Sequence, residues 1–551
     1  MPDSLLAAVQ FGAYISIIKF AFFLVLFFIW LALLGWVHDD AASVGLNERL
    51  WTAILLAIGA VGLFVWLLIP IFIVGLILCL VAISATSISY AMQRDAHVPE
   101  FERILTIEHI KTMFTDPHKK LETLQDLGFI TSNGNEIPLP EPKTSEFFSY
   151  KAAHDLFKDA ISRRTSDITL TPTSQGYSLN YVVDGATLKQ PNIRQDQVEN
   201  LSNLLKQLAN LDLEEKRKPQ KGHFRIRQEK GASKWEIRTA GSTAGEQIAI
   251  RQIMQETISK LPEINLLPEQ FEQLNSIRNL KKGLFIISGP PNSGVTTTFY
   301  ALIRNHDAFI NSISTLEYKP SGQLPNVTQE IYSLSDSGTV TYGKKLLSII
   351  RMQPNVLGAV DIKDPETARI ACQAAKEGVI VYVTMQADTV VNAVAKWLKL
   401  VGDKNLAIST LIGASNQRLF RRLCEQCKQA YEPNRELLRK FNIPPEKVKA
   451  LYRAGKVVYD KRGKPYPCEN CHEIGFFERT CAFETIVLND QLKKALAQAK
   501  STQDISTLFR RAKMRYLQEQ MLERVLDGTT SINEMIRVFS GKKQTRQKPG
   551  A

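Results

Sequence analysis

Charged residues are missing from two long stretches near the start of this 551-residue chain. Phe20 to Val37 is wholly apolar, and Trp51 to about Ile83 contains no charge. Because about 20 apolar residues in a helix cross a bilayer, the first stretch predicts a membrane anchor. A signal peptide is the competing interpretation of that stretch. No charge sits inside either stretch, so nothing indicates an ion path.

The second apolar stretch is longer than one untilted span requires. Pro70 interrupts it, but no polar loop divides it, so we expect one long helix that is kinked or tilted. The two spans, about 15–37 and 52–83, then form a transmembrane hairpin within residues 1–95, with both chain ends on one side. The Lys/Arg-rich remainder places that side in the cytoplasm.

Cysteine is scarce, with seven residues in the whole chain, yet four of them form two close pairs. Cys424 and Cys427 form one C-x-x-C, and Cys468 and Cys471 form another. In a domain that faces the cytosol this pattern favours a metal over disulfides. Four thiolates fill a tetrahedral zinc site, so the predicted Zn²⁺ is structural and not hydrolytic. The alternative is two unrelated pairs of free thiols.

Tandem repeats and low-complexity tracts are absent as well. The formal net charge of +13 suits nucleic acid, an anionic lipid surface or simply a solvated basic surface. No helix-turn-helix and no strip of aromatic and basic residues accompanies that charge. We therefore expect no nucleic-acid partner, and a DNA-uptake or conjugation motor is the weakest functional hypothesis.

Apolar patterning divides the soluble part. Residues 96–150 predict a small helical segment followed by a proline-rich linker, and the periodic apolar positions are Ile104, Ile107, Ile110 and Met113. Residues 151–260 begin with an amphipathic helix and continue as alternating strands, which predicts a compact α+β domain. A new region opens at residue 261.

A short buried strand, "GLFIISG", leads into "GPPNSGVTTTFYALI", a glycine-bounded turn that enters a helix. The template G-x-x-x-x-G-K-[ST] matches at Gly289, Gly294 and Thr296. Backbone N–H groups of such a loop surround phosphates, and its threonine can bind Mg²⁺. Val295 stands at the lysine position and offers the phosphates no charge. The candidate nucleotide-binding residues here are Gly289, Pro290, Asn292, Ser293, Gly294, Val295, Thr296 and Thr297.

The stretch "IIRMQPNVLGAVDIKDPETARIACQAAKEGVIVYVTMQADT" resembles, together with this loop, the secretion ATPases of type II secretion and type IV pilus assembly. That family typically reads R-Q-D-P-D, G-E-I-R-D, E-T-A, Q-A-A and S-T-L-H-T. Further segments follow in the same order, such as "DGTTSINEMIRV", so the resemblance covers about residues 150–540. The residues in register are Arg351, Pro354, Asp364, Glu366, Thr367, Ala368, Gln373, Ala374, Ala375 and Thr384.

The resemblance implies an α/β fold with a RecA-like P-loop core at 261–423, behind an α+β N-terminal domain at 151–260. A tetracysteine zinc insertion at 424–480 and a C-terminal helical region and tail at 481–551 complete the chain. Arg238 and Arg251 match arginines that face nucleotide phosphate, and Glu317 and Asp361 match catalytic acids. The implied cofactors are ATP with Mg²⁺ and structural Zn²⁺.

Several positions that carry chemistry depart from the family pattern. The Walker B glutamate is Asp361, one methylene shorter, and the histidine of the His box is Gln386. Phosphoryl transfer depends on positioned charge around the γ-phosphate and Mg²⁺, so we expect a pseudo-ATPase with weak or absent hydrolysis. The full set of replaced positions is Val295, Tyr318, Lys319, Val360, Asp361, Lys363 and Gln386.

The resemblance implies a membrane-anchored member of a type II secretion or type IV pilus machine in the bacterial inner membrane, with most of the chain cytoplasmic. The implied partners are copies of itself or paralogous ATPases in a hexameric ring, inner-membrane platform proteins and membrane lipid. Whether the loop binds ATP or only preserves the fold stays open. The alternative function is a non-enzymatic inner-membrane scaffold or regulator of an active paralogue.

Overall fold

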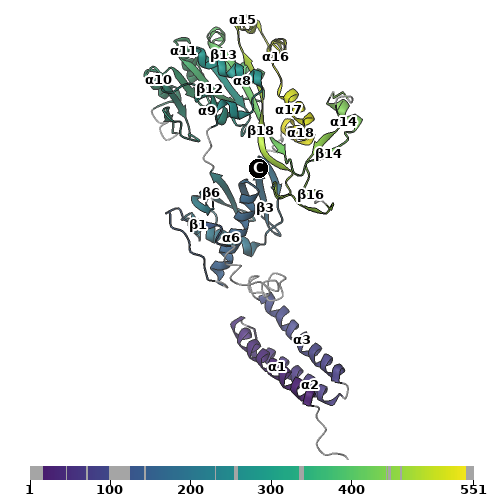
Figure 1. Cartoon of the computed structure of the whole chain (residues 1–551). Coiled ribbons are helices and arrows are strands. Elements are labelled where there is room, and N and C mark those ends of the chain that lie inside the picture. Colours follow the sequence, from purple (N-terminus) through teal and green to yellow (C-terminus); the bar gives the residue numbers. More distant parts are fainter. Residues whose placement is uncertain are drawn as a thin grey trace, which may run out of the picture. The chain divides into compact units, whose positions relative to one another are not determined.

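A computed structural model gives the fold of most of the chain (Figure 1). The expected helix with Ile104, Ile107, Ile110 and Met113 lies outside the residues that the structure describes. Those residues are 17–44, 46–69, 72–97, 124–141, 144–229, 231–253, 259–333, 340–441, 443–444, 448, 450–459 and 462–540.

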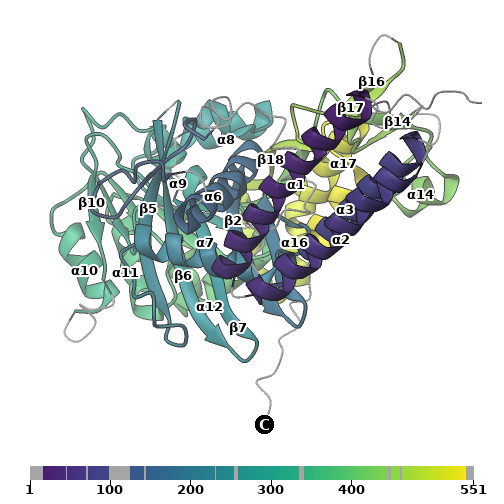
Figure 2. The same ribbon diagram turned by 90° about the horizontal axis from the view of Figure 1, so that it is seen from below.

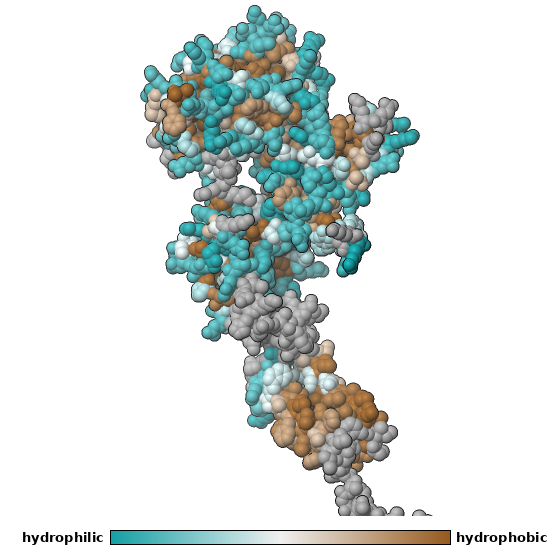
Figure 3. All heavy atoms as spheres, in the orientation of Figure 1, coloured by the Kyte–Doolittle hydropathy of each residue, from teal (hydrophilic) through white to brown (hydrophobic). Residues whose placement is uncertain are grey.

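Three apolar helices come first: α1 (Ile17–Val44), α2 (Glu48–Leu68) and α3 (Phe72–His97). They lie side by side in Figures 1 and 2, and each is long and apolar enough to cross a membrane. Figure 3 shows apolar residues over most of their surface. Inside the bundle, Trp30 Nε1 donates a hydrogen bond to the carbonyl oxygen of Leu55 at 3.2 Å.

The expected two-helix hairpin is wrong, because the second apolar stretch forms two helices. α2 ends at Leu68, and Ile69 is extended with φ −74° and ψ 122°. Ile69 precedes Pro70 in the sequence, and the residue before a proline is disfavoured in the helical region for steric reasons. This steric preference accounts for the end of α2 at Leu68, although no polar loop marks that point in the sequence.

A buried ionic contact joins α1 to α3. Asp40 Oδ2 accepts hydrogen bonds from Arg94 Nε at 2.7 Å and from the Tyr90 hydroxyl at 2.6 Å. Asp40 and Arg94 both lie in the last two turns of their helices. The two helices therefore run in the same direction, and α2, which lies between them in sequence, runs in the opposite direction.

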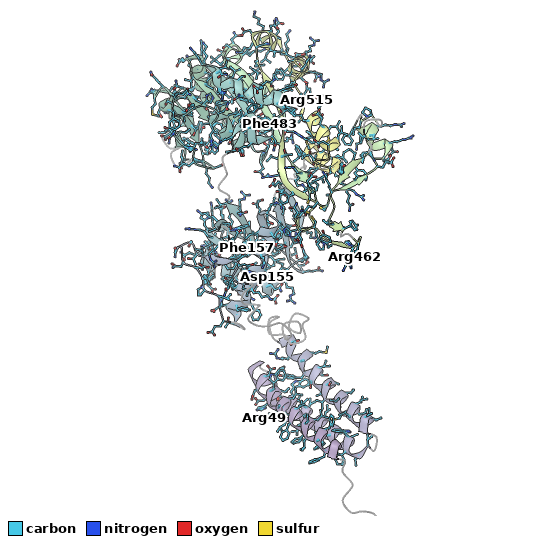
Figure 4. The ribbon with its side chains drawn as sticks, in the orientation of Figure 1. Arg49, Asp155, Phe157, Arg462, Phe483 and Arg515 are labelled. Atoms are coloured by element: carbon cyan, nitrogen blue, oxygen red, sulfur yellow. The ribbon has the colours of Figure 1, made fainter. Side chains whose placement is uncertain are left out.

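A mostly antiparallel sheet forms the next part of the chain, in the order β1-β5-β6-β7-β2-β3-β4. Phe157, labelled in Figure 4, packs edge-on against Trp235 and Phe224, with ring centroids 5.2 and 5.7 Å away. The segment expected to be a linker contributes the edge strand β1. The elements are β1 (Gly128–Ile130), α6 (Ser145–Ser162), β2 (Thr165–Thr173), β3 (Gly176–Val183), β4 (Ala186–Lys189), α7 (Gln195–Leu208), β5 (Gln220–Gln228), β6 (Gly231–Ser242) and β7 (Gly245–Ile253).

A second seven-stranded sheet has the order β10-β9-β11-β12-β8-β13-β18. The first six strands pair in parallel, and β18 pairs with β13 antiparallel. Parallel strands need crossover helices, which cover the sheet and bury its central strands on both faces. The elements are α8 (Pro268–Ser276), β8 (Gly283–Gly289), α9 (Val295–Ile303), β9 (Ile313–Glu317), β10 (Thr328–Ile331), α10 (Tyr342–Ile350), β11 (Val356–Ala359), α11 (Pro365–Lys376), β12 (Ile380–Gln386), α12 (Val390–Val401), α13 (Lys404–Thr410), β13 (Leu411–Leu423) and β18 (Phe476–Val487).

Four short strands and five helices make up the rest of the described residues. Two small antiparallel pairs, β14 with β15 and β16 with β17, lie between β13 and β18 in sequence. The elements are β14 (Gln429–Tyr431), α14 (Arg435–Lys440), β15 (Leu451–Arg453), β16 (Val457–Tyr459), β17 (Pro465–Pro467), α15 (Asp490–Gln498), α16 (Thr502–Arg511), α17 (Leu517–Leu526) and α18 (Ile532–Phe539).

One buried carboxylate ties α18 to β13. Glu534 accepts hydrogen bonds from the backbone N–H of Arg421 at 2.9 Å, from the Arg421 guanidinium at 2.8 Å and from Arg537 at 2.6 Å. Burial by itself would raise the pKa of Glu534, but the bonds from the two arginines lower it to about 2. This contact explains why glutamate and arginine are spaced three residues apart in "SINEMIRV".

We predict that Glu534→Gln lowers the free energy of unfolding by about 3 kcal/mol at pH 7, because it leaves two arginines without their carboxylate. The pKa of Glu534 is lower in the folded state than its unfolded value of 4.5, so the carboxylate stabilises the folded state above pH 4.5. This contribution is lost as the pH falls towards 2. The difference between variant and wild type should therefore shrink below pH 4.5. Urea unfolding followed by circular dichroism measures it.

The control is Glu523→Gln, which removes an exposed ion pair with Arg515. Exposed pairs contribute little, so we expect a change below about 1 kcal/mol. Equal losses in the two variants would contradict the account of Glu534.

Candidate functional site

The turn between β8 and α9 is tight and depends on glycine. Gly294, at the N-cap of α9, has φ +85°, a conformation that side chains disfavour. A Cβ on Gly289 would lie 2.2 Å from the hydroxyl oxygen of Ser293. The sequence therefore folds here into the strand–turn–helix that the phosphate-loop template requires.

Hydrogen-bond donors remain unused in this turn. The first N–H groups of α9 have no partner within the helix, as at every helix start. Among the described residues, the buried hydroxyl of Ser293 also has no hydrogen-bond partner. Gln417 of β13 donates to the carbonyl oxygen of Ser293 at 2.9 Å, which fixes the turn to its neighbouring strand. Free donors at a helix N-terminus suit an anion.

Val295 faces the apolar side of the turn. It is half-buried and packs with the core of the parallel sheet that includes Phe299. Its Cγ2 would lie 3.1 Å from a Cβ on Gly289. The side chain therefore fills space at the turn, and the turn itself carries no positive side chain.

Asp361 follows β11 and is already paired. Its Oδ2 lies 2.6 Å from Nζ of Lys363, and this hydrogen bond raises the pKa of Lys363. The backbone N–H of Asp361 donates to the hydroxyl of Thr384 on β12 at 2.8 Å. Lys363 Nζ also lies 5.7 Å from the ring centroid of Tyr318. The aspartate that we expected to be catalytic is thus neutralised by a residue two positions away.

Glu317 ends β9 and is buried, with 2% of the residue exposed. Three side chains donate to its carboxylate: the Tyr300 hydroxyl at 2.6 Å, the Thr315 hydroxyl at 2.8 Å and the Gln329 amide at 3.1 Å. Burial and then the bond to Glu317 raise the pKa of Tyr300. The sequence analysis missed Tyr300 and Gln329, and no motif spacing marks either of them.

An aromatic cluster surrounds Tyr318, one of the positions that depart from the family pattern. Tyr318 stacks on Tyr342 with ring centroids 5.2 Å apart, and Tyr332 meets both rings edge-on. The hydroxyl of Tyr342 donates to the carbonyl oxygen of Leu316 at 2.7 Å and accepts from the N–H of Val360 at 3.0 Å. Tyr318 therefore has a packing role at a position where the family usually carries an acid.

The remaining predicted residues have other partners. Gln386 ends β12, is exposed and stands opposite Gly289 in the parallel register. Its amide cannot exchange a proton as histidine does. Arg238 pairs with Glu236 at 2.6 Å and Arg251 with Asp167 at 2.6 Å, all on the first sheet.

The four cysteines form one buried cluster. Their sulfur atoms lie within 4.8 Å of one another. The Cys424–Cys468 and Cys427–Cys471 sulfurs are 3.8 and 3.5 Å apart. A tetrahedral site with metal–sulfur bonds of about 2.3 Å places its sulfurs about 3.8 Å apart. The arrangement therefore fits one metal ion, and this clustering is what the C-x-x-C spacing predicted.

The sequence model of the family described as "Type II/IV secretion system protein" matches residues 144–537. The chain belongs to this family. This type II/IV secretion system protein is 27% identical over 405 residues to the type IV pilus assembly ATPase PilB of Thermus thermophilus, covering 73% of this chain and 44% of PilB. It is 27% identical over 389 residues to the type II secretion system ATPase E of Vibrio cholerae, covering 70% of this chain and 75% of that protein.

The chain thus spans less than half the length of the Thermus relative. Among solved structures, the Legionella pneumophila ATPase DotB aligns with 73% of this chain and 98% of its own, at 16% identity and a TM-score of 0.48. Family membership confirms the resemblance to type II secretion and type IV pilus ATPases and, with the parallel sheet, the RecA-like fold of the core.

Proposed function

We propose that this type II/IV secretion system protein is a membrane-anchored subunit of a type II secretion or type IV pilus machine that binds ATP and hydrolyses it weakly or not at all. One observation carries the proposal. The turn at Gly289–Gly294 is tight and has a donor without a partner among the described residues, which suits a phosphate, while Val295 offers no charge and Lys363 pairs with Asp361.

The residues of the turn supply what ATP binding needs at the phosphates. The N–H groups at the start of α9 and the hydroxyl of Ser293 are donors without a partner in the described part of the chain. Bound ATP would itself supply the phosphoryl group that hydrolysis transfers to water. Cleavage also needs a water-orienting carboxylate and focused positive charge. Glu317 is buried and both of its carboxylate oxygens already accept hydrogen bonds from the chain, which disfavours a role in orienting water.

Assembly is a separate matter from turnover. The replaced residues Val295 and Tyr318 pack against the core without interrupting the parallel sheet, so we propose that ring formation with copies of this chain or with active paralogous ATPases is retained. Inner-membrane platform proteins are the other proposed partners. The alternative is a non-enzymatic scaffold, and ATP binding separates it from the main proposal.

The test uses the full-length protein in detergent, with ATP binding measured by isothermal titration calorimetry and phosphate release measured in parallel. We expect ATP to bind and phosphate release to stay at background. Val295→Lys should tighten ATP binding about tenfold or more, because a charge-assisted hydrogen bond contributes roughly 1.5–3 kcal/mol. Thr502→Lys, at the exposed start of α16, adds the same charge elsewhere and should leave the affinity unchanged.

If the wild type hydrolyses ATP and the Asp361→Ala variant does not, the pseudo-ATPase proposal is contradicted. Failure of both the wild type and Val295→Lys to bind ATP would favour the scaffold.

We propose that α1, α2 and α3 all cross the bacterial inner membrane. Three spans place the N-terminus opposite the soluble bulk, which we place in the cytoplasm. The Asp40–Arg94 contact supports this topology, because it brings the C-terminal ends of α1 and α3 together. Alkaline phosphatase fused to the N-terminus should be active, since it folds only outside the cytoplasm. An inactive but stable fusion would contradict three spans.

We propose that the four clustered cysteines hold one structural Zn²⁺. The backbone N–H of Gly475 and the amide of Asn470 donate to Cys471 and Cys424 sulfurs, both at 3.2 Å, as expected of partners that orient thiolates. Cys468→Ser should lose the single zinc per chain that elemental analysis detects in the wild type. Cys481→Ser, outside the cluster, should retain it. Zinc retained in Cys468→Ser, or absent from the wild type, would contradict this site.

A further inference from the structure

Mg²⁺ binds oxygen ligands in nearly ideal octahedral geometry, usually one or two carboxylates together with substrate phosphates. Thr296, Glu317 and Asp361 are the residues that the family resemblance assigns to this environment. Their contacts in this chain decide whether the ion fits.

Both carboxylate oxygens of Glu317 already accept hydrogen bonds. Two of the three donors are themselves fixed by further bonds. The Tyr300 hydroxyl accepts from the N–H of Ser321 at 3.0 Å, and Gln329 accepts from the N–H of Leu324 at 2.7 Å. A metal ion at Glu317 would therefore disrupt a buried network that spans β9, α9 and the loop before β10.

The second carboxylate, Asp361, already has the ammonium group of Lys363 beside it. Lys363 Nζ lies 2.6 Å from Oδ2. The Tyr318 ring borders the same ammonium, and Tyr318 is held by its stack on Tyr342. A divalent ion at Asp361 would have to displace this ammonium or withstand its repulsion at short range. The two carboxylates, as they are engaged within the chain, do not fit Mg²⁺.

We propose that this site binds ATP without a divalent cation and that Lys363 supplies the positive charge that Mg²⁺ and the loop lysine supply elsewhere. The inference rests on the proposed function, namely that the chain binds ATP. It names the metal-free nucleotide as the ligand and Lys363 as a nucleotide-binding residue.

Geometry and exposure support this role. Only β12 separates β11, which precedes Lys363, from β8, which leads into the turn. Neighbouring strands are about 4.8 Å apart, so the strand ends are about 10 Å apart. The Lys363 side chain is 69% exposed, so little packing surrounds it apart from its contacts with Asp361 and Tyr318. Its ammonium has three donors, of which Asp361 engages one.

The test compares ATP affinity of the full-length protein in detergent with excess Mg²⁺ and with EDTA. We expect the two dissociation constants to agree within about threefold, whereas a lysine-and-metal site depends strongly on Mg²⁺. Lys363→Met keeps the aliphatic stem and removes the charge. It should weaken binding in EDTA about tenfold or more, and Mg²⁺ should then restore part of the loss at the freed Asp361.

Two further variants sharpen the result. Lys376→Met removes an exposed lysine at the far end of α11 and should change neither constant. Asp361→Asn releases Lys363 from its ion pair, so it should tighten ATP binding in EDTA. The variant should keep the local backbone, because asparagine tolerates the left-handed φ of +57° at this position.

Wild-type binding that strengthens tenfold or more with Mg²⁺ would overturn the inference and leave the proposed ATP binding intact. Unchanged binding in Lys363→Met would overturn the role of that lysine. Absence of binding in both conditions would overturn the inference and the proposed function together.

Discussion

The parallel pairing of β8, β12, β11 and β9 is the constraint on which the candidate site depends. It brings the carboxyl ends of the four strands to one edge of the sheet, where Gly289, Gln386, Asp361 and Glu317 lie. Buried apolar side chains on both faces hold these strands, and β8 is buried along its whole length. Packing therefore sets the positions at this edge, and the chemistry of the residues there can change without loss of the fold.

The changed residues are integrated into protein contacts. Val295 packs on the core, Tyr318 joins two other tyrosines, and Lys363 pairs with Asp361. Glu317 remains a glutamate, but three side chains engage it. The contacts of Asp361 and Glu317 satisfy within the chain two carboxylates that catalysis would need to direct at a water or a metal. These contacts are the reason for our proposal that turnover is weak or absent while assembly is retained.

The sequence predicted what depends on local spacing. Glycine positions and a buried apolar run predicted β8, its turn and α9, and two C-x-x-C pairs predicted one thiol cluster. It failed at Ile69, where the rule for residues before proline outweighed the continuous apolar run. It also could not assign partners to Glu317, because Tyr300, Thr315 and Gln329 come from α9, β9 and β10, and only the folded sheet brings them together.

We infer that Lys363 supplies, at the Gly289–Thr296 turn, the positive charge that Mg²⁺ and the loop lysine supply elsewhere. The most direct measurement is an electron cryo-microscopy structure of the full-length protein with ATP and Mg²⁺. The account predicts phosphate density at the Gly289–Thr296 turn, with Lys363 between Asp361 and the phosphates and no metal ion there. A metal ion coordinated by Thr296 and Asp361, with Lys363 displaced into solvent, would contradict it.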